Sequence, residues 1–222
     1  MVELQKSVLK IVPSRVAKHS ASVRRDSRAY CRIALVSVLA FQLSACALIK
    51  KQEAPRETYE ISAPQSFSGL RASTQAQILV KLPTSLDAIN SERIIVRPST
   101  RVITYLEGAQ WSDTVPKMVQ AKLVEAFENS ASTGATAKPG DGLVIDYQLV
   151  SDLRRFEVLN GEAHIEISVK LLSDKSGKVV ETRIFSVSTA SGGDTADSYV
   201  SAFDRAFDRL SRDIIQWVLS RA

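Results

Sequence analysis

The chain has 222 residues, of which 45% are hydrophobic, enough to fill one sizeable core. The formal net charge is +5, but residues 1–45 carry eight Lys/Arg against two acids. Residues 46–222 carry 21 Lys/Arg and 22 Asp/Glu, so the body of the chain is nearly neutral. A protein that binds a phosphate backbone needs a basic face in its folded part. The charge distribution therefore argues against a nucleic-acid partner.

A short apolar run at residues 33–43 indicates an export signal. Four arginines stand before it: Arg24, Arg25, Arg28 and Arg32. The run is too short for a membrane-spanning helix, which needs about 20 apolar residues. It ends in Leu43, Ser44, Ala45 and Cys46, which resemble the lipobox of bacterial lipoprotein precursors. That resemblance implies diacylglycerol on the Cys46 thiol, cleavage before Cys46 and N-acylation of the new terminus.

The lipobox divides the chain into three parts. These are a signal peptide (1–45), a lipidated tether (46–56) and a folded domain (57–222). The leader is long, and translation from near Val23 is a hypothesis that any peptide from residues 1–22 would refute. By resemblance to Gram-negative lipoproteins, Ala47 favours the periplasmic face of the outer membrane. The several acyl chains implied at Cys46 exceed the two signals that stable anchoring requires.

The first half of the domain reads as short strands followed by a helix. Strands are expected at 59–61, 77–82, 93–97 and 102–106, where β-branched and apolar residues gather between turn signals. Asp113 or Thr114 then caps a helix that tolerates Pro116 in its first turn. Val115, Val119, Leu123 and Phe127 give this helix an apolar stripe that faces a core. Residues 131–142, rich in Gly, Ala, Ser and Thr, are typical of a loop.

The second half reads as three strands and a long final helix. Leu143–Val150 is expected as a largely buried strand, Ala163–Leu171 alternates apolar and polar residues, and Val179–Val187 completes a meander. Asn160-Gly161 is a hairpin signal between the first two strands. The helix after Asp194 carries the strongest periodic signal in the chain. The order of elements predicts a single-domain α/β sandwich, with a mixed sheet packed by two main helices.

Few residues of the mature chain can carry chemistry. His164 is its one histidine, and it stands on the polar face of an alternating strand. Lipidation would consume its one cysteine, Cys46, so neither a Cys/His zinc cluster nor an internal disulfide can form. A Ser-His-Asp site would have to recruit His164, and no G-x-S-x-G turn supports one. We therefore expect no metal, no cofactor beyond the lipid, and no enzyme.

Other polar clusters each have an ordinary structural interpretation. Four acids could converge as an acid/base pair, although carboxylates on solvated strands are commoner: Asp146, Asp152, Glu157 and Glu166. Residues 191–194, SGGD, could bind an anion, but Asp194 as a helix cap is the commoner arrangement. Residues 153–156, LRRF, are either a basic edge near lipid headgroups or a partner, or charges that discourage edge pairing. Trp111 and Trp217 could mark an interface or lie in the core.

Several segments together resemble the ABC-type transport auxiliary lipoproteins. They are YLEGAQW at 105–111 with the Pro116 helix, SLD at 85–87, RIIVR at 93–97, the strand at 147–156, AFDRA at 202–206 and DIIQWV at 213–218. The resemblance spans about residues 59–218. It implies a non-catalytic subunit, encoded with an MCE-type substrate-binding protein and an ABC permease and ATPase, that serves phospholipids or other hydrophobic compounds. Only Cys46 takes a defined role from the family, as the lipidation site.

The leading hypothesis is therefore a lipid-anchored adaptor that docks the MCE protein and that could assemble into a homo-oligomer. A general envelope assembly or scaffold lipoprotein is the alternative. A periplasmic hydrolase is a third class, which the shortage of histidines argues against.

Overall fold

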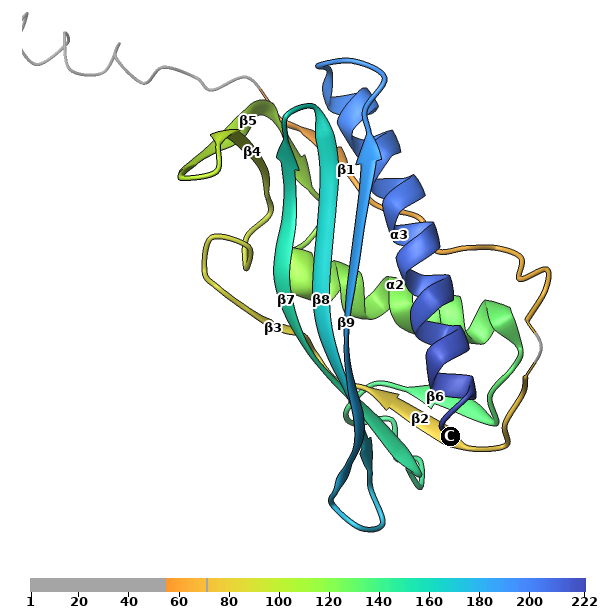
Figure 1. Cartoon of the computed structure of the whole chain (residues 1–222). Coiled ribbons are helices and arrows are strands. Elements are labelled where there is room, and N and C mark those ends of the chain that lie inside the picture. Colours follow the sequence, from red (N-terminus) through yellow and green to blue (C-terminus); the bar gives the residue numbers. More distant parts are fainter. Residues whose placement is uncertain (1–54, 71) are drawn as a thin grey trace, which may run out of the picture. The chain divides into compact units, whose positions relative to one another are not determined.

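The computed structural model describes residues 55–70 and 72–222, and these form a sheet with helices on one of its faces (Figure 1). The predicted signal peptide, the lipobox with Cys46 and residues 46–54 of the predicted tether lie outside the described residues. The elements in chain order are β1 (Glu57–Tyr59), β2 (Gln77–Val80), β3 (Thr84–Ser85), β4 (Arg93–Ser99), β5 (Val102–Trp111), α2 (Val115–Ser130), β6 (Ala135–Ala137), β7 (Tyr147–Leu159), β8 (Glu162–Ser173), β9 (Val179–Ala190) and α3 (Ala196–Leu219).

The 13-residue strand β7 is the centre of the sheet. One edge of β7 pairs antiparallel with β8 along its whole length, and β8 pairs antiparallel with β9. The other edge takes three short parallel strands in turn, with β2 beside Gln148, β3 beside Asp152 and β4 beside Val158. Beyond them, β5 and β1 continue from β4, and β6 continues from β2. The sheet is therefore mixed, with the predicted antiparallel meander in its second half.

The turn between β7 and β8 depends on the residues that the sequence places there. Asn160 and Gly161 both have positive φ, at 53° and 75°. Two consecutive positive φ angles suit the right-handed twist of the flanking strands, and Asn-Gly adopts them readily. The predicted hairpin is confirmed, and it sets the register in which Val158 lies opposite Ala163.

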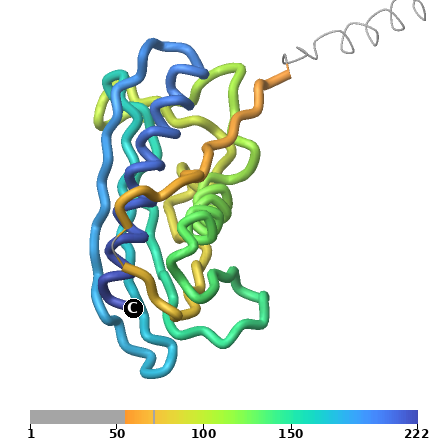
Figure 2. Tube along the Cα trace, turned by 90° about the vertical axis from the view of Figure 1, so that its right-hand side faces the viewer, coloured from red at the N-terminus to blue at the C-terminus, as the bar shows by residue number. Residues whose placement is uncertain are grey.

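Both helices lie on the same face of the sheet. Figure 2 shows the three strands of the meander at the left, α3 next to them and α2 beyond. Strand β8 explains this arrangement, because its alternate residues are buried under α3. These residues are Ala163, Ile165, Ile167, Val169 and Leu171, each at most 2% exposed. The predicted α/β fold, with its mixed sheet and its second helix at the C-terminal end, is confirmed.

Three aromatic rings join the sheet to α3. Phe156 of β7 stacks on Phe203 of α3 with ring centroids 4.6 Å apart. Trp111 at the end of β5 meets both rings edge-on, at 5.6 Å and 5.4 Å. All three side chains are buried, so Trp111 lies in the core rather than at an interface. Trp217 is also buried and packs edge-on against Phe185.

The segment after β1 crosses the two helices and ties them together. Ile61 and Ala63 are buried, and the amide of Ser62 donates to Asp204 Oδ1 of α3 at 2.7 Å. Asn129 of α2 donates to the carbonyl of Pro64. This segment therefore closes the helical layer through hydrogen bonds to both helices.

Two expectations about strand positions are wrong. The strand predicted at Leu143–Val150 begins at Tyr147, and Val144 is 83% exposed, because Asp146 ends the preceding loop by bonding to β2. The segment expected to be a loop contains the short strand β6, which pairs with β2. Three residues of Ala and Thr give too weak a pattern to be recognised, and the pairing with β2 stabilises them.

Candidate functional site

The face of the meander that points away from the helices is polar and charged. We call it the outer face. Its members alternate with the buried residues of each strand and pair across it: Asp152, Arg155 and Glu157 of β7, His164, Glu166, Ser168 and Lys170 of β8, and Thr182, Ile184, Ser186 and Ser188 of β9. The view in Figure 1 looks onto this face, with both helices behind the sheet. Most of the side chains that could carry chemistry therefore gather on one surface.

A buried ion pair lies at one end of the outer face. Arg97 of β4 donates through Nε to Glu157 Oε2 at 2.6 Å, and the Glu157 side chain is 5% exposed. Arg97 also donates through Nη1 to the carbonyl of Thr100, in the turn between β4 and β5. A buried carboxylate without a partner is costly, so Arg97 is what makes Glu157 tolerable there. Glu157 is thus held in place by structural contacts.

The other acids of the outer face also have cationic partners. Asp152 lies 3.4 Å from Arg154 Nε, and Glu166 lies 3.8 Å from both Arg154 Nη1 and Arg155 Nε. The fourth acid, Asp146, accepts from the amide of Gln77. Because each of the four acids has its own partner, they do not form the acid/base pair considered from the sequence.

The LRRF segment is central rather than at an edge. Strand β7 is paired on both sides, so the interpretation of Arg154 and Arg155 as charges that protect a free edge is wrong. A β-bulge between Leu153 and Arg155 shifts the register, and both guanidinium groups are exposed, at 42% and 52%. The sequence could not show this, because the partners of β7 come from distant segments.

Three arginines line a small hollow beside this bulge. We call it the arginine hollow, and its members are Arg97, Thr100, Arg154, Arg155, Glu157 and Leu159. Its volume is about 130 Å³. Half of the lining residues are arginines, and the one carboxylate among them, that of Glu157, is already paired with Arg97. The hollow is therefore a candidate site for an anion.

His164 contacts a serine and a glutamate. Its Nδ1 lies 2.7 Å from Ser188 Oγ, and its Nε2 lies 3.6 Å from Glu162 Oε2. The His164 side chain is 22% exposed, so it is less exposed than the sequence suggested. Ser188 and His164 lie directly opposite each other in the β8–β9 ladder. The contact therefore joins two neighbouring strands of the outer face.

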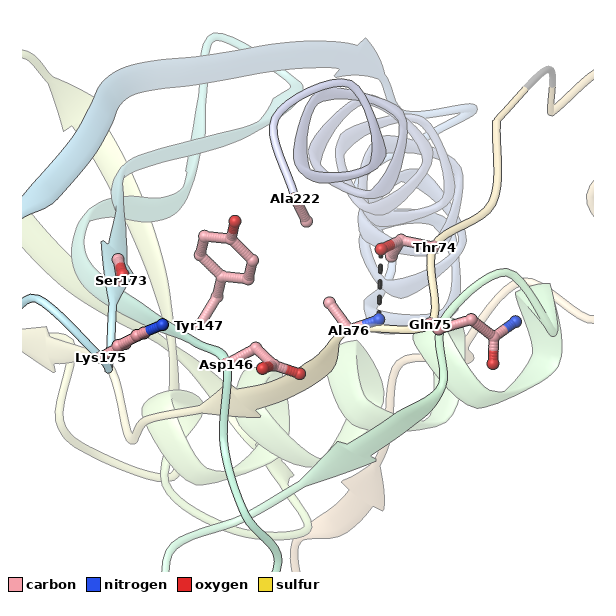
Figure 3. A pocket seen from close by; sticks show the side chains of 8 residues that line it. All are labelled: Thr74, Gln75, Ala76, Asp146, Tyr147, Ser173, Lys175 and Ala222. Atoms are coloured by element: carbon pink, nitrogen blue, oxygen red, sulfur yellow. Dashed lines mark hydrogen bonds between the residues drawn. The ribbon is translucent and has the colours of Figure 1, made fainter.

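A second, wider cavity of about 440 Å³ lies near the last residue of the chain (Figure 3). Its lining comes from the segment before β2, the start of β7, the β8–β9 turn and Ala222: Thr74, Gln75, Ala76, Asp146, Tyr147, Ser173, Lys175 and Ala222. Asp146 already holds β2, and Thr74 accepts from the amide of Ala76 at 3.2 Å. Two polar groups of this cavity, those of Asp146 and Thr74, thus serve local structure.

The segment at residues 191–194 does not cap α3 as predicted. The N-cap is Thr195, whose hydroxyl accepts from the amide of Ser198. Asp194 instead accepts from the hydroxyl of Tyr199 at 3.3 Å. Thr195 was not recognised because Asp194 precedes it and both residue types favour the N-cap position.

Two acids have shifted pKa values for different reasons. Burial raises the pKa of Asp204, while its hydrogen bond from the Ser62 amide acts in the opposite direction. The Arg221 guanidinium lowers the pKa of the exposed Glu181. Asp204 lies on the helical side of the domain and Glu181 on the edge strand β9, so neither belongs to the arginine hollow.

Within residues 55–70 and 72–222, we find no group of three or more His, Cys, Asp or Glu arranged to hold a metal ion. None of the helices described there is long and apolar enough to cross a membrane.

Comparison with protein families decides the assignment. The family model for the ABC-type transport auxiliary lipoprotein component matches residues 59–215. This chain belongs to that family. The match covers both helices almost completely and the whole sheet from the end of β1 onward, so the resemblance expected from the sequence is confirmed. The family is a lipoprotein component of an ABC-type transport system.

Relatives of known sequence or structure agree with this assignment. An uncharacterized protein of Bradyrhizobium diazoefficiens, bll6063, is 31% identical over 168 residues. The match covers 75% of this chain and 46% of that relative, so the chain spans about half of its length. Protein XCC0632 from Xanthomonas campestris is 28% identical with a TM-score of 0.67, over 74% of this chain and 95% of that one. A second solved structure, 14% identical with a TM-score of 0.60, shares the fold.

Proposed function

We propose that this chain is a lipid-anchored auxiliary subunit of an MCE-type ABC transport system for phospholipids or other hydrophobic compounds. It docks the substrate-binding MCE protein at the periplasmic face of the outer membrane and catalyses no reaction. The observation that carries the proposal is the family match over residues 59–215, in a chain that also has a lipobox ending in Cys46.

The anchor follows from the residues before the domain. Cys46 supplies the thiol for diacylglycerol, and the following segment to residue 56 spans at most about 35 Å when extended. Two or more acyl chains give stable membrane attachment. The domain is thus held close to the membrane surface, where it can meet a partner that crosses the periplasm.

The polar side chains of the domain support an adaptor role. Glu157, Asp152 and Glu166 are paired with arginines, and Asp146 holds β2. A catalytic group would instead be presented in a cleft with an unused proton acceptor or nucleophile. The outer face and the edge strand β9 are surfaces open to a partner, and β9 carries the exposed apolar side chains Val180 and Ile184.

Crosslinking in the native host tests the docking role. A tagged chain, crosslinked in intact cells and purified from the membrane, should recover an MCE-type protein, together with the ABC permease and ATPase. The matched control is Cys46→Ala, which lacks the anchor and should recover much less. Repeated recovery of none of these partners would contradict the proposal, and crosslinked ladders of the chain itself would show a homo-oligomer.

The same experiment separates the alternative role. A general scaffold lipoprotein would be recovered with envelope proteins unrelated to transport, and its gene would not lie beside genes for an ABC permease, an ATPase and an MCE protein. That outcome would favour the scaffold role over the transport role.

A further inference from the structure

The arginine hollow has donors that the described structure leaves unused. Arg154 and Arg155 each carry several N–H groups in a planar fork. Among the described residues, one side-chain hydrogen bond uses them, from Arg154 Nε to Asp152 Oδ2 at 3.4 Å. The contacts of both arginines with Glu166, at 3.8 Å, are longer than hydrogen bonds. An anion can therefore bind these groups without displacing a short hydrogen bond.

The third arginine of the hollow, Arg97, is already held by contacts within the domain. Arg97 is held by Glu157 on one side and by the Thr100 carbonyl on the other, so its position is set before a ligand arrives. The acids that balance Arg154 and Arg155, Asp152 and Glu166, do not line the hollow. The lining of the hollow therefore contains three arginines but only one carboxylate, Glu157, which is already paired with Arg97. Guanidinium groups suit tetrahedral oxyanions because they can donate two parallel hydrogen bonds.

The sheet connects the first described strand to the hollow through two further strands. Strand β1 pairs Glu57 with Ala109 of β5, β5 pairs with β4, and Arg97 of β4 pairs with Leu159 at the end of β7. Figure 2 shows the first described residues on the side of the domain opposite the three strands of the meander. A lipid at Cys46, about ten residues earlier, would hold the domain within about 35 Å of the membrane surface.

We propose that the arginine hollow binds the phosphate of an anionic phospholipid headgroup. The volume of about 130 Å³ suits a phosphate group rather than an acyl chain. Arg154 and Arg155 supply the hydrogen bonds, and Arg97 supplies a fixed positive charge. This inference relies on the proposed anchor, which confines the domain to the neighbourhood of the lipid surface. Its binding chemistry does not depend on the MCE partner.

The test uses the full mature chain, purified from the envelope in an uncharged detergent. Equilibrium binding of radiolabelled phosphatidylglycerol in mixed micelles is measured for wild type and R154Q/R155Q. The matched control, K178Q/R209Q, removes the same charge from exposed positions outside the hollow. We expect the affinity of R154Q/R155Q for phosphatidylglycerol to fall at least about tenfold, equivalent to about 1.4 kcal/mol, and that of the control to stay within about twofold.

Titration with inorganic phosphate separates the two sources of the same chemical group. Phosphatidylglycerol binding that falls in R154Q/R155Q, and that excess phosphate reduces in wild type, supports a lipid headgroup held by its phosphate in the hollow. Binding of phosphate alone, with lipid binding unchanged in R154Q/R155Q, would overturn the lipid assignment.

Two further outcomes would overturn the proposal. One is equal lipid binding by R154Q/R155Q and wild type. The other is loss of the crosslinked MCE protein in R154Q/R155Q with lipid binding intact, which would make the hollow a protein contact. Failure of MCE crosslinking in wild type would instead count against the adaptor role alone.

Discussion

The two faces of strand β8 differ in what their side chains do. On the covered face, Ile165, Ile167 and Val169 are at most 2% exposed and pack under α3. On the outer face, His164 contacts Ser188 of β9, and Glu166 lies near Arg155 of β7. One strand thus builds the core with one set of residues and a charged surface with the next. Substitutions on the covered face should therefore change the stability of the domain, and substitutions on the outer face should change its binding to a partner or ligand.

The largest effect is expected on the covered side, at Trp111. Its side chain is 1% exposed and contacts Phe156 and Phe203, so Trp111→Ala removes the centre of the aromatic cluster. We expect the free energy of unfolding to fall by about 3–5 kcal/mol. Urea denaturation measures it, with Lys170→Ala on the outer face as the control. A loss below about 1 kcal/mol at Trp111 would contradict the described core.

The next effect is expected at one end of the outer face, in the buried Arg97–Glu157 pair. Arg97→Met leaves a carboxylate that is 5% exposed without its partner, and should cost about 3 kcal/mol. Glu157→Gln in the same background removes the unpaired buried charge and should recover part of the lost stability. A double-mutant cycle measured by denaturation gives the coupling. If the two changes were additive, the ion pair would not contribute as described.

A smaller effect is expected at Asp204 of α3, which accepts a hydrogen bond from Ser62 in the segment after β1. Because burial raises the pKa of Asp204 in the folded state, the unfolded state loses this proton first as pH rises. The contribution of Asp204 to stability should therefore decrease with rising pH, from the ordinary aspartate pKa up to the raised one. Asp204→Asn keeps an acceptor for Ser62 and should remove this pH dependence, whereas Asp204→Ala should cost about 1 kcal/mol. Identical pH profiles for wild type and Asp204→Asn would contradict this account.

The smallest effect is expected on the outer face, at the Ser188–His164 contact. His164→Ala should change the free energy of unfolding by less than about 0.5 kcal/mol and leave MCE crosslinking intact. A fluorophosphonate probe should not label the purified chain. Labelling of wild type that disappears in both Ser188→Ala and His164→Ala would show a reactive serine and favour the hydrolase class.

The covered face could be predicted from the sequence more fully than the outer face. Alternation along β8 and the four-residue spacing from Val115 to Phe127 identified core residues, because burial repeats with the period of the element. The Asn160-Gly161 turn was readable for the same kind of local reason. These signals need only one segment at a time.

The arginine hollow could not be predicted in this way. Arg97 and Glu157 are 60 residues apart, and they meet because β4 pairs in parallel with the end of β7. Residues 153–156 showed that two arginines lie together, but their partners depend on strand order and on a β-bulge. Parallel pairings between distant segments leave no local pattern, so a site built across them appears only in the folded chain.

The central claim, that this domain acts from the envelope as a lipoprotein, is tested most directly by the mass of the mature chain from its native host. We predict a protein that begins at Cys46 and carries a diacylglycerol and an N-acyl group there. An unmodified Cys46 thiol in a chain that retains residues 23–45 would contradict the account.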